Sequence, residues 1–188
     1  MLRLEDIKKR LRRIPEGCTP NVGIDAAVAL VLRYGDKGPE VLLMQRTECE
    51  GDPWTGHVSL PGGKAELDDK SLLLTAERES YEELGVDLAQ IASPIGCLEK
   101  IRPYSKTSQK PLLVSPFVFL THSPVSVTLG PEAASFFWLP LKPTADGDFD
   151  AEHLYQSGSQ QVALPCWNYA GYTVWGMTYR VIQNLLLT

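Results

Sequence analysis

Three glutamates, Glu79, Glu82 and Glu83, lie in a stretch from Ser71 to Leu84 that has strong helix formers and neither glycine nor proline. Because an α-helix advances about 100° per residue, these positions fall within an arc of roughly 100° on one face. Carboxylates crowded on one face repel each other unless a cation lies between them. Oxygen-rich clusters suit hard divalent ions such as Mg²⁺ or Mn²⁺, which also bind substrate phosphates. The spacing therefore predicts a site for such an ion.

The residues beside this cluster suit the same chemistry. Arg78 directly precedes Glu79, and its planar guanidinium can hold a carboxylate through two hydrogen bonds, which lysine does poorly. Gly62 and Gly63 lie ahead of the helix, in a turn where the backbone can approach its neighbours closely. The carbonyl of Gly63 is therefore a candidate metal ligand. The loop and helix together predict a site that holds metal and phosphate.

Length and composition predict one globular domain. The chain has 188 residues, of which 44% are hydrophobic, and this is ample for a continuous core. We expect residues 1–20 to form an N-terminal helix and linker within the same domain as residues 21–188. The four cysteines lie far apart and include no C-x-x-C pair, so neither a zinc knuckle nor a disulfide ladder is expected.

Charge and hydropathy limit the classes of partner. The formal net charge of −5 has the wrong sign for binding phosphate backbones, so nucleic acid is not an expected partner. No stretch reaches the roughly 20 apolar residues of a membrane span, and the N-terminus lacks the apolar run of a secretory signal. We therefore expect a cytoplasmic protein that makes no membrane contact.

The hydrophobic periodicity predicts an α+β fold in which a mixed β-sheet lies between helices. Strong helix formers between Ser71 and Gly85, with serine as N-cap and glycine after the last turn, give the clearest element. The other predicted elements are a helix at 4–13, strands at 24–32 and 41–44, a loop at 48–63, strands at 95–101, 112–120, 125–129 and 135–139, a hairpin at 152–164 and a closing helix at 174–187.

The segment from Gly63 to Val86, with its Arg78-Glu79 and Glu82-Glu83 pairs, resembles the Nudix box, G-x5-E-x7-R-E-U-x-E-E-x-G-U, where U is a bulky aliphatic residue. This resemblance implies a Nudix-type α/β/α sandwich and a pyrophosphohydrolase that uses Mg²⁺ or Mn²⁺. It implies that the three glutamates are metal ligands and that Arg78 orients them. The Arg-Glu-x-x-Glu-Glu core is intact.

The sequence departs from the box in three places. Asp69 fills the first acidic position, one extra residue precedes Arg78, and Ser80 replaces a bulky aliphatic residue. Either Asp68 or Asp69 is then the carboxylate that pairs with Arg78, and the sequence leaves both open.

A box that is longer by one residue resembles the pattern of the coenzyme A diphosphatase branch of the family. The segments 42–46, 56–60 and 175–178 resemble that branch as well. That branch usually has Leu-Arg-x-His where this chain has residues 51–54, and phenylalanine where it has Leu60. The resemblance makes coenzyme A the favoured substrate.

Candidates for contacting the substrate lie outside the box. Arg46, Lys64, Arg102 and Lys106 are candidate phosphate ligands, and for each of the two lysines the ordinary alternative is solvated surface. Trp54 is a candidate for stacking on a nucleobase or for covering the core, and His57 for contacting phosphate or for a structural role.

Glu132 precedes a predicted strand, at a place where some relatives supply a further metal ligand or general base. We count it among the catalytic candidates, with Arg78, Glu79, Glu82 and Glu83. Either Glu132 or a glutamate of the box accepts the proton of the attacking water, and the sequence does not choose between them.

These residues predict hydrolysis of a diphosphate bond in a nucleoside diphosphate linked to another moiety, with coenzyme A or acyl-CoA favoured. The alternative substrates are ADP-ribose, a nucleotide sugar or a dinucleotide. An alternative of another class is a catalytically silent module that senses a nucleotide. The expected partner is a small-molecule nucleotide diphosphate, and assembly into a homodimer is left open.

Overall fold

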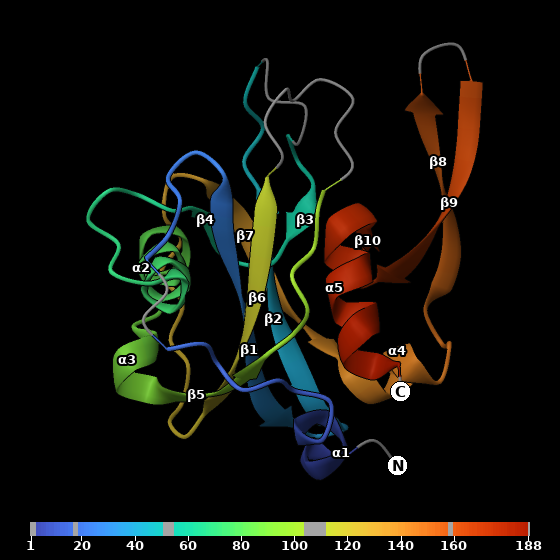
Figure 1. The fold of residues 1–188 in the computed structure, drawn as a ribbon. Coiled ribbons are helices and arrows are strands. Elements are labelled where there is room, and N and C mark those ends of the chain that lie inside the picture. The colour runs from blue at the N-terminus through green and yellow to red at the C-terminus, as the bar shows by residue number, and fades with distance from the viewer. Residues whose placement is uncertain (1–2, 17–18, 51–54, 104–111, 158–159, 188) are drawn as a thin grey trace.

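A mixed β-sheet forms the centre of the protein (Figure 1). The computed structural model describes residues 3–16, 19–50, 55–103, 112–157 and 160–187. The sheet has seven strands, with the order β3-β2-β1-β6-β5, while β4 pairs with β1 and β7 pairs with β2. The pairing of β1 with β6 is parallel and the others are antiparallel. The strands are β1 (Asp25–Gly35), β2 (Gly38–Arg46), β3 (Val58–Ser59), β4 (Gly62–Lys64), β5 (Ala92–Cys97), β6 (Leu113–Thr121) and β7 (Ala133–Pro140).

A second, smaller sheet leads to the C-terminal helix. It contains the antiparallel strands β8 (Asp150–Ser157), β9 (Gln160–Tyr169) and β10 (Tyr172–Trp175), in the order β10-β9-β8. The far ends of β8 and β9 project from the rest of the molecule (Figure 1). This pairing confirms the hairpin predicted at 152–164.

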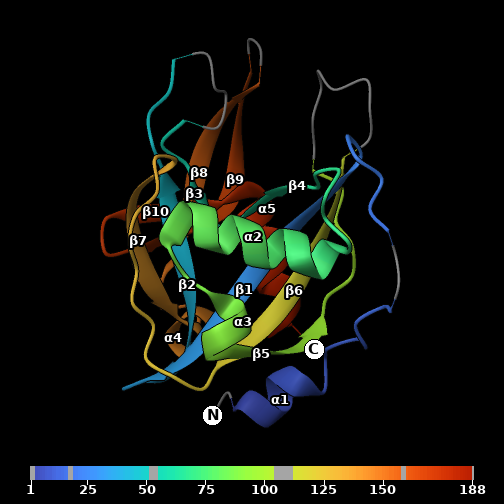
Figure 2. The same cartoon turned by 90° about the vertical axis from the view of Figure 1, so that its left-hand side faces the viewer.

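Helices cover both faces of the large sheet, as the sequence predicted. α2 (Leu72–Leu84) crosses one face with the short α3 (Leu88–Ile91) beside it, and α5 (Gly176–Leu186) lies on the other face (Figures 1 and 2). The remaining helices are α1 (Leu4–Lys8) and α4 (Leu141–Ala145).

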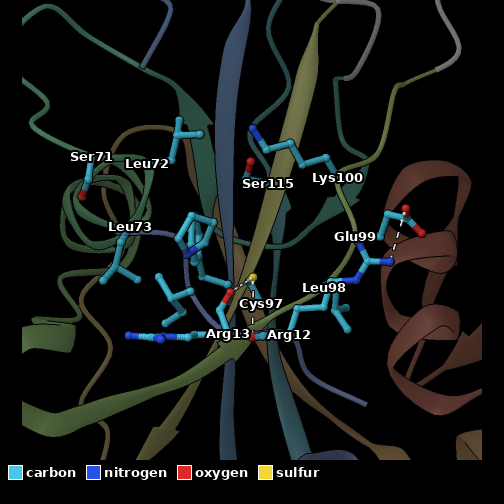
Figure 3. A pocket seen from close by; sticks show the side chains of 13 residues that line it. Arg12, Arg13, Ser71, Leu72, Leu73, Cys97, Leu98, Glu99, Lys100 and Ser115 are labelled. Carbon is cyan, nitrogen blue, oxygen red and sulfur yellow. Dashed lines mark hydrogen bonds and ion pairs between the residues drawn. The ribbon is translucent and has the colours of Figure 1, made fainter. Parts of the chain in front are cut away.

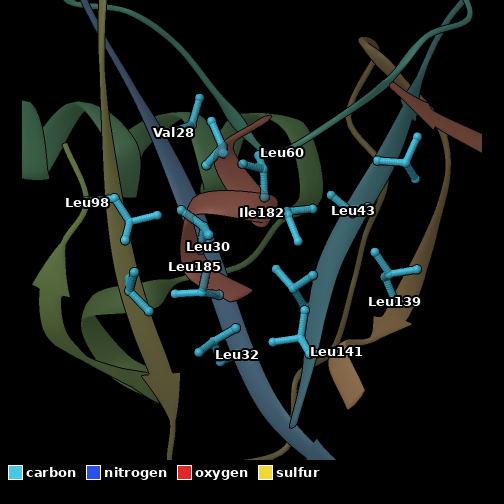
Figure 4. Close-up of a cluster of buried hydrophobic side chains, with 14 of the residues drawn as sticks. Val28, Leu30, Leu32, Leu43, Leu60, Leu98, Leu139, Leu141, Ile182 and Leu185 are labelled. Atoms are coloured by element: carbon cyan, nitrogen blue, oxygen red, sulfur yellow. The ribbon is translucent and has the colours of Figure 1, made fainter. Parts of the chain in front are cut away.

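The strand β1 divides the hydrophobic core into two layers. Since successive side chains of a strand point to opposite faces, Leu30 and Leu32 pack toward Ile182 and Leu185 of α5 (Figure 4). The alternate residues, among them Ala29, pack in the layer that contains α2. All of these side chains are buried, which explains why the sequence there is apolar at every position.

The ends of α2 lie where the sequence predicted them. The Ser71 side chain accepts a hydrogen bond from the Leu74 N–H at 3.3 Å, which caps the first turn. Gly85 follows the last turn with φ of 64°, a conformation that favours glycine, and its N–H donates to the Tyr81 carbonyl at 2.8 Å. These two caps fix the helix that carries the glutamates.

Two predicted boundaries near the N-terminus were wrong. The helix predicted at 4–13 ends at Lys8, because Arg12 and Cys97 exchange backbone hydrogen bonds of 2.8 and 3.0 Å beside β5. The loop predicted at 48–63 includes the short strands β3 and β4, since their backbones pair with β2 and β1. Local glycine and proline signals did not reveal these long-range pairings.

The later part of the chain holds further corrections. Residues 125–129 form no strand, because this segment runs along the end of α2, where the Thr128 N–H donates to the Leu84 carbonyl at 2.8 Å. The strand predicted at 95–101 occupies Ala92–Cys97 instead. Val174 belongs to β10 rather than to the closing helix, which begins at Gly176. None of the helices in the described part of the chain is both long and apolar enough to cross a bilayer.

Candidate metal and phosphate site

The Arg78 guanidinium lies at the centre of the acidic cluster. Its Nε and Nη2 donate to the two carboxylate oxygens of Asp69 at 3.1 and 3.0 Å. Its Nη1 donates to Glu79 Oε1 at 3.1 Å and to Glu82 Oε2 at 3.0 Å. A further bond of 3.1 Å runs from Nη2 to the Lys64 carbonyl. The hydrogen bonds to Asp69 and the charges of the three carboxylates hold the pKa of Arg78 above its usual range. The Arg78 guanidinium therefore joins Asp69 in the loop before α2, the strand β4 and the acidic face of α2.

Asp69, rather than Asp68, is the carboxylate that pairs with Arg78. Its side chain is buried and also accepts hydrogen bonds from the Thr75 hydroxyl and the Glu66 N–H, both at 2.9 Å. Burial alone would raise the pKa of Asp69, but the hydrogen bonds from Arg78, Glu66 and Thr75 outweigh that effect and lower it. Asp69 therefore stays ionised and fixes the guanidinium. The exposed Asp68 has no such contacts with the described residues.

Glu83 is the most buried of the three helix glutamates. Only 3% of the residue is exposed, and its Oε2 accepts the Gly62 N–H at 2.8 Å. Burial raises the pKa of Glu83 to about 8, the charges of Glu79 and Glu132 add to this, and the Gly62 N–H opposes it. A buried carboxylate with so high a pKa is poised to gain stabilisation from a cation.

Glu79 packs directly against Gly63 of β4. A Cβ added to Gly63 would clash with Glu79 Oε1, so a larger residue would displace the carboxylate. Burial raises the pKa of Glu79, Arg78 opposes the shift, and the charges of Glu82 and Glu132 add to it. The glycine therefore lets the carboxylate lie against the backbone.

The loop between β6 and β7 brings Glu132 to the site. The Gly130 N–H donates to the Glu83 carbonyl at 2.8 Å, and a Cβ at Gly130 would clash with the Glu82 carbonyl oxygen. Glu132 itself lies 4.0 Å from Arg46 Nη2, and 66% of its side chain is exposed. Sequence reasoning missed the glycine at 130, because its effect depends on a helix end far away in the chain.

Of the other predicted site residues, Lys64 and His57 lie near the site. Lys64 is exposed at the end of β4, directly after Gly62 and Gly63. The His57 ring packs edge-on against Trp175 with centroids 4.9 Å apart, and its carbonyl accepts the Arg46 N–H at 2.9 Å. The Arg102 carbonyl accepts a long hydrogen bond of 3.5 Å from Arg180. Both Trp54 and Lys106 lie outside the described residues.

An aromatic cluster around Trp175 was not predicted. The ring centroids of His153 and Tyr155 lie 4.2 and 5.4 Å from that of Trp175, in addition to the His57 contact. Three separate segments supply these residues, so no local spacing in the sequence reveals the cluster.

The chemistry of the three helix glutamates suits a divalent cation, but their carboxylates do not point toward a common centre. No group of three histidine, cysteine, aspartate or glutamate side chains within these residues is arranged to hold an ion. Arg78 engages Glu79 and Glu82, and the Gly62 N–H engages Glu83. The available donors are hard carboxylate oxygens beside a glycine backbone, which suits Mg²⁺ or Mn²⁺.

Comparison with known proteins decides the family. The NUDIX domain model matches residues 24–157, which is well over half of the chain. The chain belongs to the Nudix family. An uncharacterized Nudix hydrolase, NudL, of Yersinia pestis is 30% identical over 151 residues, covering 78% of this chain and 71% of NudL. The family match and this relative support the expectation of a pyrophosphohydrolase.

Two other relatives of this Nudix chain match over shorter stretches. An uncharacterized protein of Schizosaccharomyces pombe is 43% identical over 55% of this chain, and Nudix hydrolase 15, mitochondrial, of Arabidopsis thaliana is 45% identical over 33% of it. The matched part of the chain spans only 32% and 22% of the length of these two proteins.

Solved structures share the fold. A bifunctional NMN adenylyltransferase/ADP ribose pyrophosphatase from Francisella tularensis has a TM-score of 0.56 at 19% identity, covering 92% of this chain and 42% of its own. A C. elegans Ap4A hydrolase has a TM-score of 0.51 at 22% identity, covering 65% of this chain and 84% of its own. The predicted α+β Nudix fold, with a mixed sheet between helices, is confirmed.

Proposed function

We propose that this Nudix protein hydrolyses a phosphoanhydride bond in a nucleoside diphosphate joined to a second moiety, with Mg²⁺ or Mn²⁺ as cofactor. One observation carries the proposal: Glu79, Glu82 and Glu83 share one face of α2 beside Gly62 of β4, and Arg78 holds two of them. Such a concentration of carboxylates costs stability unless it serves a cation.

In this proposal the side chains of Glu79, Glu82 and Glu83, with the Gly63 carbonyl, hold the metal. Once bound, the ion would neutralise diphosphate oxygens and lower the pKa of a water molecule. Arg78 positions the glutamates because Asp69 fixes its guanidinium from the opposite side. Arg78 is therefore a positioning residue.

We place the proton acceptor at Glu132. Glu79 accepts from Arg78 and Glu83 accepts from Gly62, whereas the Glu132 carboxylate is largely open to solvent. After burial, which is the largest cause, the charge of Glu132 contributes to the raised pKa values of Glu79 and Glu83, so it lies within their electrostatic reach. A carboxylate at this position can accept a proton from water beside the acidic face.

For the phosphates, Arg46 and Lys64 are the proposed ligands. Arg46 ends β2, with its guanidinium 4.0 Å from Glu132, and Lys64 ends β4 directly after its two glycines. Both strands therefore bring a cation to the rim of the acidic cluster, where a diphosphate needs charge compensation.

Coenzyme A or acyl-CoA is our favoured substrate. The support is the sequence resemblance of segments 56–60 and 175–178 to the coenzyme A diphosphatase branch, together with their contact in this fold. Thr178 Oγ1 donates to the Val58 carbonyl at 3.1 Å, and Trp175 packs on His57. ADP-ribose, a nucleotide sugar or a dinucleotide remains the alternative substrate. The structures named for ADP-ribose and Ap4A share only the fold with this chain.

We also propose that residues 1–20 belong to the same domain as residues 21–188. Ile7 of α1 is fully buried in the core layer that contains α5, and Arg10 Nη1 donates to the Leu185 carbonyl at 2.9 Å. A separate N-terminal unit would not bury Ile7 in the core of the rest of the chain.

A substrate panel tests the proposal. Purified protein would receive coenzyme A, ADP-ribose, diadenosine tetraphosphate or a nucleotide sugar, each with Mg²⁺ or Mn²⁺, and chromatography would identify the products. Conversion of coenzyme A to adenosine 3',5'-bisphosphate and a phosphopantetheine product is the expected result, with the Glu82→Gln variant as a blank. If folded, metal-supplemented protein hydrolysed none of these diphosphates, a nucleotide-sensing module would be the better interpretation.

A further inference from the structure

A cavity of about 420 Å³ lies at the start of α2, away from the acidic face. The N-terminal segment around Ile14 borders one side, the first turn of α2 at Ser71 to Leu73 borders another, and β5, β6 and Lys100 complete the wall (Figure 3). Small-molecule sites commonly enclose roughly 300–1,000 Å³, so this volume suits a small ligand.

Most of the cavity wall is apolar. Leu72, Leu73, Leu98, Ile14 and Phe117 all line it. An apolar chain or ring would therefore gain from burial there, because contact with these side chains removes apolar surface from water. The wall by itself does not define the polar end of a ligand.

Ser115 supplies a polar group inside the cavity. The residue is 4% exposed, and its hydroxyl has no hydrogen-bond partner among the described residues. Ser115 and Phe117 are two apart on β6, so they share the face of the strand that forms the cavity wall. A buried hydroxyl can donate one hydrogen bond and accept others, and leaving it unpaired is costly. Its partner is therefore to be sought in a ligand.

The charged residues at the cavity rim indicate the sign of the charge that the ligand carries. Arg12 is ion-paired with Glu99 at 3.4 Å, and Arg13 with Glu16 at 2.6 Å. Lys100 has no carboxylate partner among the described residues, and its side chain points toward Ser115 in Figure 3. One cation without a counter-charge beside one hydroxyl suits a single negative charge.

We propose that this cavity binds a small amphipathic monoanion, an apolar chain or ring that carries one carboxylate. The carboxylate accepts hydrogen bonds from the Lys100 ammonium and the Ser115 hydroxyl, while the apolar part lies against Leu73 and Phe117. At about 1.5 Å per residue, Leu73 lies roughly 9 Å along the helix axis from Glu79, so this is a second site. The proposal stands independently of the hydrolase activity.

Calorimetric titration of the full chain with octanoate tests this site. We expect saturable binding with one octanoate per chain, and at least about tenfold weaker binding by Lys100→Met, which keeps the aliphatic stem but removes the charge. Ser115→Ala should weaken binding by about threefold or more. Leu73→Glu, which places a negative charge in the apolar wall, should abolish it.

Matched controls separate the cavity from general effects of charge and hydrophobicity. Lys37→Met removes a lysine from the exposed β1–β2 turn and should leave octanoate affinity unchanged. Octanol lacks the carboxylate and acetate lacks the chain, so both should bind at least about tenfold more weakly than octanoate. The proposal would be overturned if octanoate gave no saturable heat, if octanol bound equally well, or if well-folded Lys100→Met and Leu73→Glu variants bound it like the wild type.

Discussion

Both carboxylate oxygens of Asp69 accept hydrogen bonds from Arg78, at 3.1 Å from Nε and 3.0 Å from Nη2. The Nη1 group of the same guanidinium donates to Glu79 and Glu82. Because the buried Asp69 fixes the guanidinium, Arg78 in turn holds the carboxylates of the half-buried Glu79 and the exposed Glu82 in place. A lysine could not make all of these contacts, because its ammonium lacks the planar array of five N–H donors that a guanidinium has.

The first prediction compares Asp69→Asn with Asp68→Asn. The former removes the charge that fixes Arg78, so we expect kcat to fall at least about tenfold and the free energy of unfolding to fall by roughly 1.5–3 kcal/mol. Asp68 is exposed and makes none of these contacts, so Asp68→Asn should behave like the wild type. Steady-state kinetics and urea unfolding measure both effects, and equal behaviour of the two variants would contradict the assignment of Asp69.

A second prediction concerns Glu82→Gln. The amide keeps the volume but removes one charge that the proposed metal requires, so turnover should fall by at least about 10²-fold while the fold is retained. Glu77→Gln is the matched control. Glu77 lies on the same helix but is not one of the glutamates that contact Arg78 or Gly62. Hydrolysis rates at saturating Mg²⁺, with circular dichroism to verify folding, measure the difference. Near-normal turnover by Glu82→Gln would count against the site.

The third prediction tests the proton acceptor. If Glu132 accepts the proton of water, Glu132→Gln should lower kcat by about 10²-fold or more. KM should change little, because the carboxylate makes no proposed contact with the nucleotide. Steady-state kinetics measure both constants, and a wild-type kcat in this variant would return the role to a glutamate of α2.

The fourth prediction is a gain of stability in Glu83→Gln without metal. Burial, chiefly, raises the pKa of Glu83 from its ordinary 4.5 to about 8. The folded chain therefore holds a proton that the unfolded chain has lost, so the wild type loses stability as pH rises from 4.5 to 8, and the loss levels off above 8. The amide that replaces the carboxylate in Glu83→Gln carries no charge, and its carbonyl oxygen can still accept the Gly62 N–H.

Thermal unfolding in EDTA at several pH values measures this effect. The variant should melt above the wild type at pH 8, by about 2–4 °C for each kcal/mol, and the two should converge near pH 5. With Mg²⁺ added, the wild type should gain stability and the variant should gain little. A variant that melted below the wild type at pH 8 without metal would show that Glu83 is not a strained carboxylate.

The sequence predicted the parts of this protein whose signals are local. The helix α2 has a serine cap, a glycine after its last turn and a periodic pattern of carboxylates, so its position and its acidic face followed from neighbouring residues. The buried strand β1 followed likewise from its continuous apolar run. The choice between Asp68 and Asp69 did not, because it depends on which side chain the fold buries beside Thr75.

Features that depend on distant contacts escaped prediction. Residues 125–129 have the composition of a strand but supply an N–H group to the end of α2 instead. Val174 has helical spacing with later residues, yet it pairs with Trp167 in the small sheet. In both cases backbone pairing with another segment overrides the local pattern.

The final prediction compares alanine at Gly62 and at Gly63. A Cβ at Gly62 would clash with the Ala27 carbonyl oxygen and lie 2.6 Å from the Val28 Cα, where Gly62 has φ of +151°, so neither backbone can move away cheaply. Gly62→Ala should therefore lower the melting temperature substantially. A Cβ at Gly63 would meet the Glu79 carboxylate, and this side chain can rotate away. Gly63→Ala should therefore keep most of the stability but lose metal affinity and turnover by about tenfold or more, since Glu79 leaves its place. Calorimetry and Mg²⁺ titration of activity distinguish the two, and a Gly63→Ala variant with normal metal dependence would show that Glu79 does not need to lie against this strand.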